Sequence, residues 1–456
     1  MWIGFDYGSA NCAVGIMQEG KISQIPLSAN SQYLPSTLYA LDRELIAQAV
    51  YQGISQDKKS DYAKLRSSQL SRAVQVRHEL DLNADEQTVF VGQAAIDAYL
   101  EMPEDGFYVR SPKSFLGANG LREEQVALFE DIVTLMMLHV KGITDNYLAD
   151  NGLAPATHAV IGRPVNFQST GGEKSNQQAE AILTQAAMRA GFTQVAFLFE
   201  PVAAGMDFEA SLEHNSTVLV VDVGGGTTDC SVVRMGPSYI ANKQREQDCL
   251  GHSGQRVGGN DLDIALAMKG FMPSLGLDSL LKTGKPMPSA PFWQAVAVND
   301  ISAQREFASL GARKLLDSMI KDAEAPELVI RLKKVQQEQL SYKLVRQAET
   351  AKVALSDANQ TQCQLDFIAT GLSVGLTQGQ FSEFITEPLA KIEALMQIAV
   401  AKAAVSPDTV YVTGGTARSP AIYAKIASVY PEANIVVGDH FGSVTAGLTR
   451  WTQQAF

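Results

Sequence analysis

The chain has 456 residues, of which 46% are hydrophobic and 19% are charged, so it can bury a sizeable core and form more than one domain. Its formal net charge of −12 argues against a general nucleic-acid or anionic-membrane surface, because both need a basic patch that releases counterions. The sequence shows neither a basic leader with an apolar core nor an apolar run of about 18 residues, which predicts a soluble, cytoplasmic protein.

Short β-branched runs that end in glycine turns recur along the chain, and helical patterns separate them, which is typical of an α/β fold. Helices with apolar residues on one face are predicted at 121–141 and 173–190. The predicted strands are WIGFDYG at 2–8, THAVIGRP at 157–164, STVLVVDVGGG at 216–226 and TVYVTGGT at 409–416.

The first and third of these strands open similar units, each with an apolar run, an aspartate, a glycine turn and a second run. Repetition of a unit at a distance indicates duplicated domains, so the sequence predicts two similar lobes. We expect the boundary between them in the polar stretch 209–216. We also expect the chain to return to the first lobe near 439–448.

The four cysteines form no CxxC pair and no metal-binding spacing, which predicts reduced thiols and neither zinc nor haem. Two of them lie beside glycine turns, where oxidation sensitivity is one interpretation and a small buried filler is the other. The cysteines are Cys12, Cys230, Cys249 and Cys363, the first two being those beside the turns.

Two of the glycine turns have the composition of a phosphate site. Each follows an aspartate at a strand end, and glycine lets successive backbone N–H groups approach a phosphate chain. Asp6 and Asp222 would hold Mg²⁺ mostly through water. Either turn alone is equally compatible with an ordinary hairpin, but two in matching contexts favour the phosphate site. The hydroxyls that would bond phosphate oxygens are those of Ser9, Thr227 and Thr228.

Neither Gly-Lys-Ser nor Gly-Lys-Thr occurs, and no GxGxxG opens a helix, so P-loop and Rossmann interpretations lose their main support. A set of ordered motifs along nearly the whole chain resembles instead the ATPase domain of the 70-kDa heat-shock chaperones, within the actin and sugar-kinase superfamily. These motifs are IGFDYGSANC, VGQAA (91–95), RSPKSFLG (110–117), IGRPVNF (161–167), FEPVAAG (199–205), VVDVGGGTTD, RVGGNDLD (256–263), ETAKVALS (349–356) and VTGGTARSP (412–420).

This resemblance implies two actin-like, ribonuclease H-like lobes that flank a nucleotide cleft, with ATP and Mg²⁺ as cofactors. Lobe I would comprise residues 1–212. Lobe II would comprise 213–424, with an enlarged outer subdomain at about 263–346, and 425–456 would return to lobe I. We expect a monomer.

The resemblance also implies a role for each site residue. Lys113 would neutralise charge that develops at the γ-phosphate and place the attacking water. Glu200 and Asp222 would order water around Mg²⁺, and Asp229 and Thr227 would complete the water site. The residues expected around the phosphates are Gly8, Ser9, Ala10, Asn11, Gly224, Gly225, Gly226, Thr228, Gly258 and Gly259. Those expected around adenosine are Glu349 and Lys352 at the ribose, Ser356 at the base, and Gly414, Gly415 and Arg418 at the closing turn.

The residues taken alone leave alternatives open. An isolated Lys113 in a loop-like stretch would ordinarily be solvated. Glu349, Lys352 and Ser356 fall at i, i+3 and i+7, which also fits an exposed, salt-bridged helix.

Three features depart from the family pattern. Ala10 stands where the family usually has a threonine, which removes one hydroxyl contact to phosphate and would either slow hydrolysis or weaken the ATP-specific state. A glutamine near Gln177 replaces the arginine that relays the family's proline switch. The chain stops at WTQQAF after its last helix, so we expect no peptide-binding domain within it.

We therefore predict a slow, Mg-dependent ATPase whose lobes switch with nucleotide state to act on a protein partner or client. A co-chaperone or a nucleotide-exchange factor is a further expected partner. One alternative is a kinase of the same superfamily, for which no aspartate base beside an acceptor is identified. The other is a nucleotide-dependent scaffold or filament protein, which ETAKVALS and GGNDLD disfavour.

Overall fold

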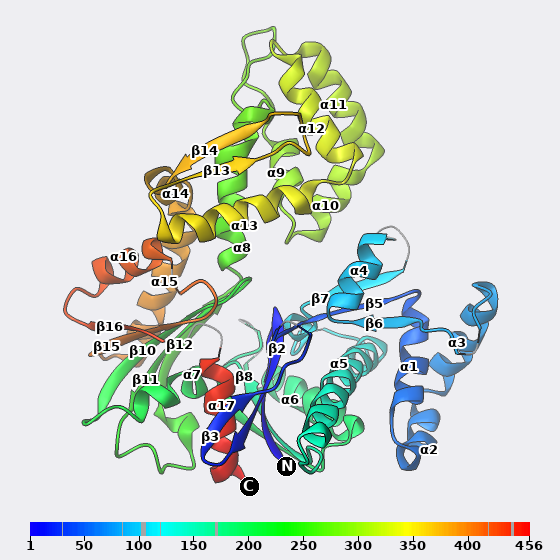
Figure 1. Cartoon of the computed structure of the whole chain (residues 1–456), viewed down its shortest axis with the longest axis vertical. Helices are drawn as coiled ribbons and strands as arrows, with labels where there is room; N and C mark the ends of the chain where they lie inside the picture. Colours follow the sequence, from blue (N-terminus) through cyan, green and yellow to red (C-terminus); the bar gives the residue numbers. More distant parts are fainter. Residues whose placement is uncertain are drawn as a thin grey trace.

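Two β-sheets with the same strand order form the centre of the computed structural model, and helices pack against both (Figure 1). The fold is therefore mixed α/β, as predicted. The structure describes residues 1–29, 31–83, 85–101, 106–118, 120–168, 172–417, 419–438 and 442–456.

The first sheet has the order β3-β2-β1-β8-β9, and β4 pairs with the edge of β2. The central strand β1 runs antiparallel to β2 and parallel to β8. The strands of this sheet are β1 (Trp2–Tyr7), β2 (Asn11–Gln18), β3 (Lys21–Gln24), β4 (Leu34–Pro35), β8 (His158–Arg163) and β9 (Gln194–Phe199).

The second sheet has the order β12-β11-β10-β15-β16, and its central strand β10 is likewise antiparallel to β11 and parallel to β15. All four strands predicted from the sequence are confirmed, as β1, β8, β10 and β15. The duplicated unit is therefore a β-hairpin at the centre of each sheet. The strands of this sheet are β10 (Ser216–Val223), β11 (Thr228–Met235), β12 (Cys249–Gln255), β15 (Thr409–Thr413) and β16 (Asn434–Val437).

Two helices, α7 (Glu200–Glu209) and α17 (Ser443–Ala455), share one hydrophobic cluster with both sheets. Their close packing depends on glycine. A Cβ added at Gly4 of β1 would lie 2.3 Å from the backbone nitrogen of Thr449, and one at Gly447 would lie 2.0 Å from the carbonyl oxygen of Ala203. These helices therefore join the two sheets into one body.

The opposite face of each sheet carries its own core, because side chains alternate along a strand. In β1 the odd-numbered Ile3, Phe5 and Tyr7 belong to a core with α5 (Glu123–Asp150) and α6 (Gly172–Ala190). The helix predicted at 173–190 is confirmed, and the one predicted at 121–141 continues to Asp150. In the second sheet, α15 (Thr386–Ala403) packs on β11 and β12, and α16 (Pro420–Val429) packs on α15.

A smaller body follows the first hairpin. Its three-stranded sheet has the order β6-β5-β7, and α4 packs on β5. The elements of this body are β5 (Thr37–Ala40), α1 (Ile46–Gly53), α2 (Gln56–Leu65), α3 (Ser67–Glu79), β6 (Val89–Val91), α4 (Gln93–Glu101) and β7 (Phe107–Arg110).

A larger, mainly helical body follows β12 and stands at the top of Figure 1. It contains the segment 263–346, whose helices share a continuous hydrophobic core with the second sheet. The elements of this body are α8 (Gly259–Leu266), α9 (Ala290–Val296), α10 (Ile301–Ala308), α11 (Leu310–Asp322), α12 (Pro326–Gln337), α13 (Ser341–Asp357), β13 (Gln360–Gln364), β14 (Ser373–Thr377) and α14 (Gln378–Phe384).

The end of the chain returns to the first sheet through α17, which packs on β1 and β2. The strand before it, β16, still pairs with β15 of the second sheet. The return thus begins after Val437, later along the chain than the expected residue 425. Residues 439–441 of the expected return lie outside the described residues.

Within the ranges that the structure describes, no helix combines the length and the apolar character that crossing a bilayer requires. The four cysteines are free thiols, and Cys12 and Cys230 are fully buried. Burial raises the pKa of the Cys12 thiol to about 12, which makes it a poor nucleophile and fits the interpretation as a buried filler.

Candidate active site

Each sheet carries a glycine turn at the same place, between its central strand and the antiparallel neighbour. Residues 8–10 join β1 to β2, and residues 224–227 join β10 to β11. Asp6 and Asp222 both stand one residue before the end of the central strand. Their cross-strand partners differ, because Asp6 faces Ala13 whereas Asp222 faces Asp229.

The carbonyl groups of the second turn are held by the start of α8. The Gly259 N–H donates to the Gly224 carbonyl oxygen at 2.9 Å, and the Asn260 N–H donates to that of Gly225 at 2.7 Å. A turn held in this way through its carbonyls leaves its N–H groups for an anion. The N–H groups of this turn that donate to no acceptor within the described residues are those of Gly225, Gly226 and Thr227.

The first turn is held in the same manner by Ser36. Its N–H donates to the Ala10 carbonyl oxygen at 2.8 Å, and its hydroxyl donates to that of Gly8 at 2.7 Å. In the described part of the chain, the N–H groups of Ser9 and Ala10 donate to no acceptor. Both turns therefore present backbone donors, as the phosphate-site interpretation requires.

A buried lysine and four acidic side chains lie close to the turns. Lys113 is 6% exposed, and its ammonium forms an ion pair with Glu200, the first residue of α7. The solvated alternative for Lys113 is therefore wrong. Although burial lowers the pKa of Lys113, the charges of Glu200, Asp6 and Asp229 raise it above its usual range, so the lysine is charged.

The acidic residues raise one another's pKa values. Burial, followed by the charge of Glu200, raises the pKa of Asp6 to about 7 against the opposing effect of Lys113. Burial and the charge of Asp229 raise the pKa of Asp222 to about 7. Burial and Glu200 do the same for the pKa of Asp229. Four carboxyl groups around one ammonium thus make a site that favours an added cation.

Lys113 lies in a short 3-10 helix, η2 (Pro112–Phe115), that a loop of the first half holds in place. Ser111, the residue before this helix, has the left-handed backbone conformation with φ of +55°. The Gln168 amide donates to the carbonyl oxygens of Ser114 at 3.1 Å and of Leu116 at 2.8 Å. The loop after β8 therefore fixes the lysine turn, a contact that no local pattern in the sequence indicates.

On the predicted adenosine side, α13 packs over the segment that supports the second turn. The Lys352 ammonium lies 2.8 Å from an Asp263 carboxylate oxygen and donates to the Gly259 carbonyl oxygen at 3.4 Å. Glu349 pairs with Arg346 on the same helix at 2.5 Å, as the exposed-helix alternative expects. The Ser356 hydroxyl donates to the Lys352 carbonyl oxygen at 3.2 Å. Of these three residues, Lys352 is the one whose hydrogen bonds within the described part of the chain reach the turn region.

The third glycine segment, after β15, lies against the second turn. The Thr416 N–H donates to the Val223 carbonyl oxygen at 3.1 Å, and the Thr416 hydroxyl donates to that of Gly224 at 3.3 Å. Gly414 has φ of +92°, and a Cβ there would lie 2.4 Å from a carboxylate oxygen of Asp222. Gly415 is exposed beside it, and Arg418 lies outside the described residues.

One site prediction needs correction. Thr228 is predicted to bond a phosphate oxygen, but its side chain is fully buried and its hydroxyl donates to the Val257 carbonyl oxygen at 2.7 Å. That hydroxyl is used inside the second sheet and is not available to a ligand. Gln177, near which a glutamine is predicted to replace the family's relay arginine, donates to Glu173 on its own helix.

The arginine that contacts the Pro164 segment is Arg163, which sequence analysis did not single out. It pairs with Glu180 on α6 and donates to the carbonyl oxygens of Pro164 and Val165, each at 3.1 Å. The sequence does not reveal this role, because the position of a residue in a strand does not indicate which carbonyl oxygens its side chain contacts.

Comparison with known proteins identifies the family. The model of the family described as Hsp70 protein matches residues 120–270 and 313–435, which together exceed half of the chain. The chaperone protein dnaK of Emiliania huxleyi is 24% identical over an alignment of 486 residues, which covers 98% of this chain and 60% of that protein. The chain therefore spans about three fifths of the length of this relative. By its match to the family model, the chain belongs to the Hsp70 family.

Proposed function

We propose that this chain binds ATP with Mg²⁺ and hydrolyses it slowly, as a chaperone-type ATPase that acts on a protein partner. The observation that carries the proposal is the pair of equivalent glycine turns beside the cluster of Lys113 and four acidic residues, because each turn has N–H groups that donate to no acceptor among the described residues. Membership of the Hsp70 family supports a chaperone-like, nucleotide-binding function.

The two sheets with their attached bodies would be two actin-like lobes with the nucleotide between them. Residues 1–212 would form lobe I and residues 213–424 lobe II, with the helical body at 263–346 as its outer part. The identical strand order of the sheets supports this division, as does the position of α7 and α17 between them. The pairing of β16 with β15 would extend lobe II to Val437.

The residues present fit Mg²⁺. Burial, and after it the charge of neighbouring carboxylates, raises the pKa values of Asp6, Asp222 and Asp229 to about 7, and a cation would stabilise their ionised forms. Among the described residues, no group of three or more His, Cys, Asp or Glu side chains is arranged to hold a metal directly. Asp6 and Asp222 would therefore hold the ion through water, which Mg²⁺ retains readily. When bound, Mg²⁺ would neutralise charge on the phosphate oxygens.

The protein groups would act by position and charge. The N–H groups of both turns would bind phosphate oxygens, and Lys113 would stabilise charge that develops at the γ-phosphate. Glu200 would keep Lys113 oriented, since the two already form an ion pair. Asp229 and Thr227 would hold the attacking water. Ala10 contributes no hydroxyl to the first turn, which is consistent with slow turnover.

The nucleoside would lie between α13 and the third glycine segment. Lys352 is already held over Gly259 by Asp263, so it is preorganised for a ribose hydroxyl. Glu349 would leave Arg346 and turn to the ribose, and Ser356 would face the base. Gly414 and Gly415 would close the opposite side, where side chains would block approach.

We propose that closure of the lobes on ATP is transmitted to a client or to a co-chaperone or exchange factor. Such a switch requires that ATP bind one arrangement of the lobes more tightly than the other. The protein would work in the cytoplasm as a monomer. Transfer of the γ-phosphate to a small acceptor, as in a kinase, is an outcome of the test below, because no acceptor base is identified among the described residues.

The test is to measure equilibrium binding of ATP with and without Mg²⁺ and single-turnover hydrolysis by the same preparation. We expect wild type to bind and slowly cleave ATP. Lys113→Ala should bind ATP with little change and lose about 100-fold or more in the cleavage rate, as removal of a transition-state donor does. Asp222→Asn should lose the Mg²⁺ dependence of binding.

The matched control is Lys333→Ala, which removes a lysine paired at 2.6 Å with Asp317 on the neighbouring helix. Both helices belong to the helical body that contains 263–346, which is called the outer body below. It should change neither binding nor cleavage. Binding without cleavage by wild type would favour a nucleotide sensor or a kinase. Absence of ATP binding would overturn the proposal.

A further inference from the structure

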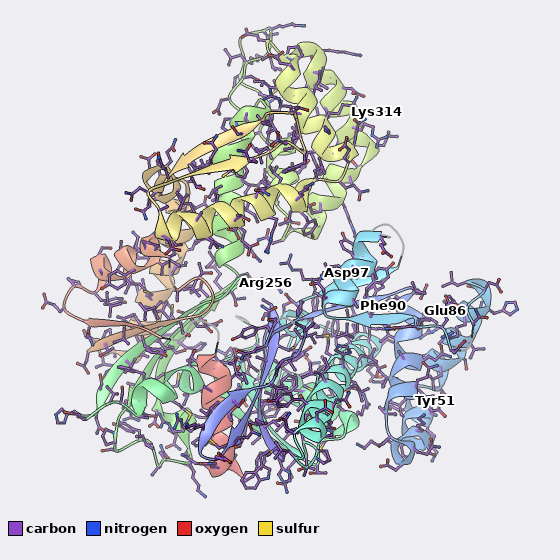
Figure 2. All side chains as sticks on the ribbon, viewed as in Figure 1. Tyr51, Glu86, Phe90, Asp97, Arg256 and Lys314 are labelled. Carbon is purple, nitrogen blue, oxygen red and sulfur yellow. The ribbon has the colours of Figure 1, made fainter. Side chains whose placement is uncertain are left out.

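Arg256 connects the two halves of the molecule, that is, the half built on the first sheet and the half built on the second sheet. This contact lies next to Lys113. Arg256 follows the last residue of β12, and in Figure 2 it lies near the centre of the molecule, just below α8. Its guanidinium Nη2 donates to the carbonyl oxygen of Ser114 at 3.2 Å. Ser114 is the residue directly after Lys113 in η2. A side chain of the second half therefore holds the backbone of the lysine turn.

The backbone that follows Arg256 is hydrogen-bonded to the second glycine turn and to the strand after it. The next residue, Val257, donates its N–H to Gln255 at 2.9 Å and accepts the Thr228 hydroxyl at 2.7 Å. Two residues further along, Gly259 donates to the carbonyl oxygen of Gly224. Residues 256–259 thus contact the second turn through their backbone, and they contact the lysine turn through the Arg256 side chain.

The same edge of the second half makes a second contact across the molecule. The Asn166 amide and Nε2 of His252 in β12 lie 2.8 Å apart, and a hydrogen bond from Asn176 at 2.7 Å orients the Asn166 amide. Asn166 belongs to the loop that carries Gln168, the other donor to the Ser114 carbonyl. The lysine turn is therefore held from the first half by Gln168 and from the second half by Arg256.

We propose that Arg256 is a positioning residue for Lys113, so that the lysine takes its catalytic position only when the two halves are in contact. This rests on the proposed ATP hydrolysis. Lys113 is buried among carboxylates of both halves, so a small shift of η2 changes its distance to each of them. A displacement of about 1 Å at a reacting group can lower a rate about 100-fold. An arginine suits this task because its planar, rigid fork is always charged and reaches a carbonyl far from its own backbone.

The first measurement compares Arg256→Ala and Arg256→Lys with wild type in single-turnover hydrolysis and in ATP binding. Arg256→Ala should lower the cleavage rate about tenfold, a free-energy difference of about 1.4 kcal/mol, while the Kd for Mg-ATP changes less than about twofold. Arg256→Lys should recover part of the rate, since it keeps the charge and one donor. A loss confined to binding would overturn the proposal.

A double-mutant cycle separates positioning from general structural damage. If Arg256 acts through Lys113, adding Arg256→Ala to Lys113→Ala should lower the residual rate no further. Independent, additive losses would contradict the proposal. Arg331→Ala is the matched control, because Arg331 also donates to a backbone carbonyl, that of Ser274 at 2.7 Å, but within the outer body. It should leave both rate and affinity unchanged.

A readout independent of activity keeps the test decisive if the wild-type chain cleaves no ATP. Loss of the Arg256 contact should speed hydrogen exchange of the backbone amides at 111 and 113–116, whereas Arg331→Ala should not. Unchanged exchange of these amides in Arg256→Ala would show that Arg256 does not hold the lysine turn, whatever the protein's activity. Faster exchange without ATP cleavage would support the contact and refute the proposed function alone.

Discussion

Replacing Gly258 by alanine should displace the second glycine turn. Gly258 has an extended backbone, with φ of −167° and ψ of −159°, so alanine meets no conformational penalty there. The added Cβ, however, would lie 2.7 Å from the carbonyl oxygen of Gly224 and 2.9 Å from that of Gly225. The closer contact is about 0.7 Å short of the ordinary limit of 3.4 Å. Backbone atoms, unlike a flexible side chain, must shift as a unit to relieve it.

This shift should lower both the free energy of unfolding and the affinity for Mg-ATP. Overpacking of a well-packed site typically destabilises a protein by about 1–3 kcal/mol. The shift also stretches the hydrogen bonds from Gly259 and Asn260 that hold the turn, at 2.9 and 2.7 Å. Because these bonds place the N–H groups proposed to bind phosphate, affinity for Mg-ATP should fall about tenfold or more.

The assay is the urea midpoint of unfolding together with the Kd for Mg-ATP. Gly142→Ala is the matched control, because Gly142 lies within α5 and an added Cβ there meets nothing within 4 Å. That control should stabilise the protein by up to about 1 kcal/mol and leave Kd unchanged. A Gly258→Ala protein with wild-type stability and affinity would refute the role assigned to the turn's carbonyl contacts.

Three further changes test other parts of the structure. Gly447→Ala would place a Cβ 2.0 Å from the Ala203 carbonyl oxygen and should lower the thermal midpoint through a loss of about 1–3 kcal/mol. Arg245→Ala leaves the buried Glu209 carboxylate without its partner at 2.8 Å and should cost about 3–5 kcal/mol in urea unfolding. Burial raises the pKa of Asp263 to about 6, so its contribution to stability is present below its unfolded pKa and is lost as pH rises from about 4 to 6. Asp263→Asn should flatten the stability profile over that pH range, and an unchanged profile would contradict the assignment.

The strands and both glycine turns were predictable because their signals are local. An apolar run, an aspartate and glycines occur within about ten residues, and the pairing of β1 with β2 and of β10 with β11 needs only a short hairpin. The C-terminal part of α5 was missed for a local reason too. Gly142 and the polar residues after it indicate a helix end, but Thr144 and Leu148 are buried and the packing carries the helix to Asp150.

Residues that hold the turns from a distance were not predictable. Ser36 reaches Gly8 across 28 positions and Thr416 reaches Gly224 across 192. Serine and threonine have no pattern that distinguishes such contacts from surface positions. Thr228 was misassigned for a related reason. Thr227 precedes β11 and Thr228 is its first residue, and the alternation of side chains along that strand, which is known only from the sheet, turns the Thr228 hydroxyl inward.

The two halves of the molecule have the same strand order but carry different charged side chains. The cross-strand partner of Asp6 is Ala13, whereas that of Asp222 is Asp229, so the hairpin of the second half carries two carboxylates on adjacent strands and the hairpin of the first half carries one. Lys113 belongs to the first half, yet the charges that act on it include Asp6 and Asp229 from both. Separating the halves would leave the Asp222 and Asp229 pair without that ammonium. Besides burial, the charge of Glu200, which belongs to the first half, raises the pKa of Asp222 and Asp229 more than the charge of Lys113 lowers it. A cation bound beside these carboxylates would relieve the repulsion that arises where the two halves meet.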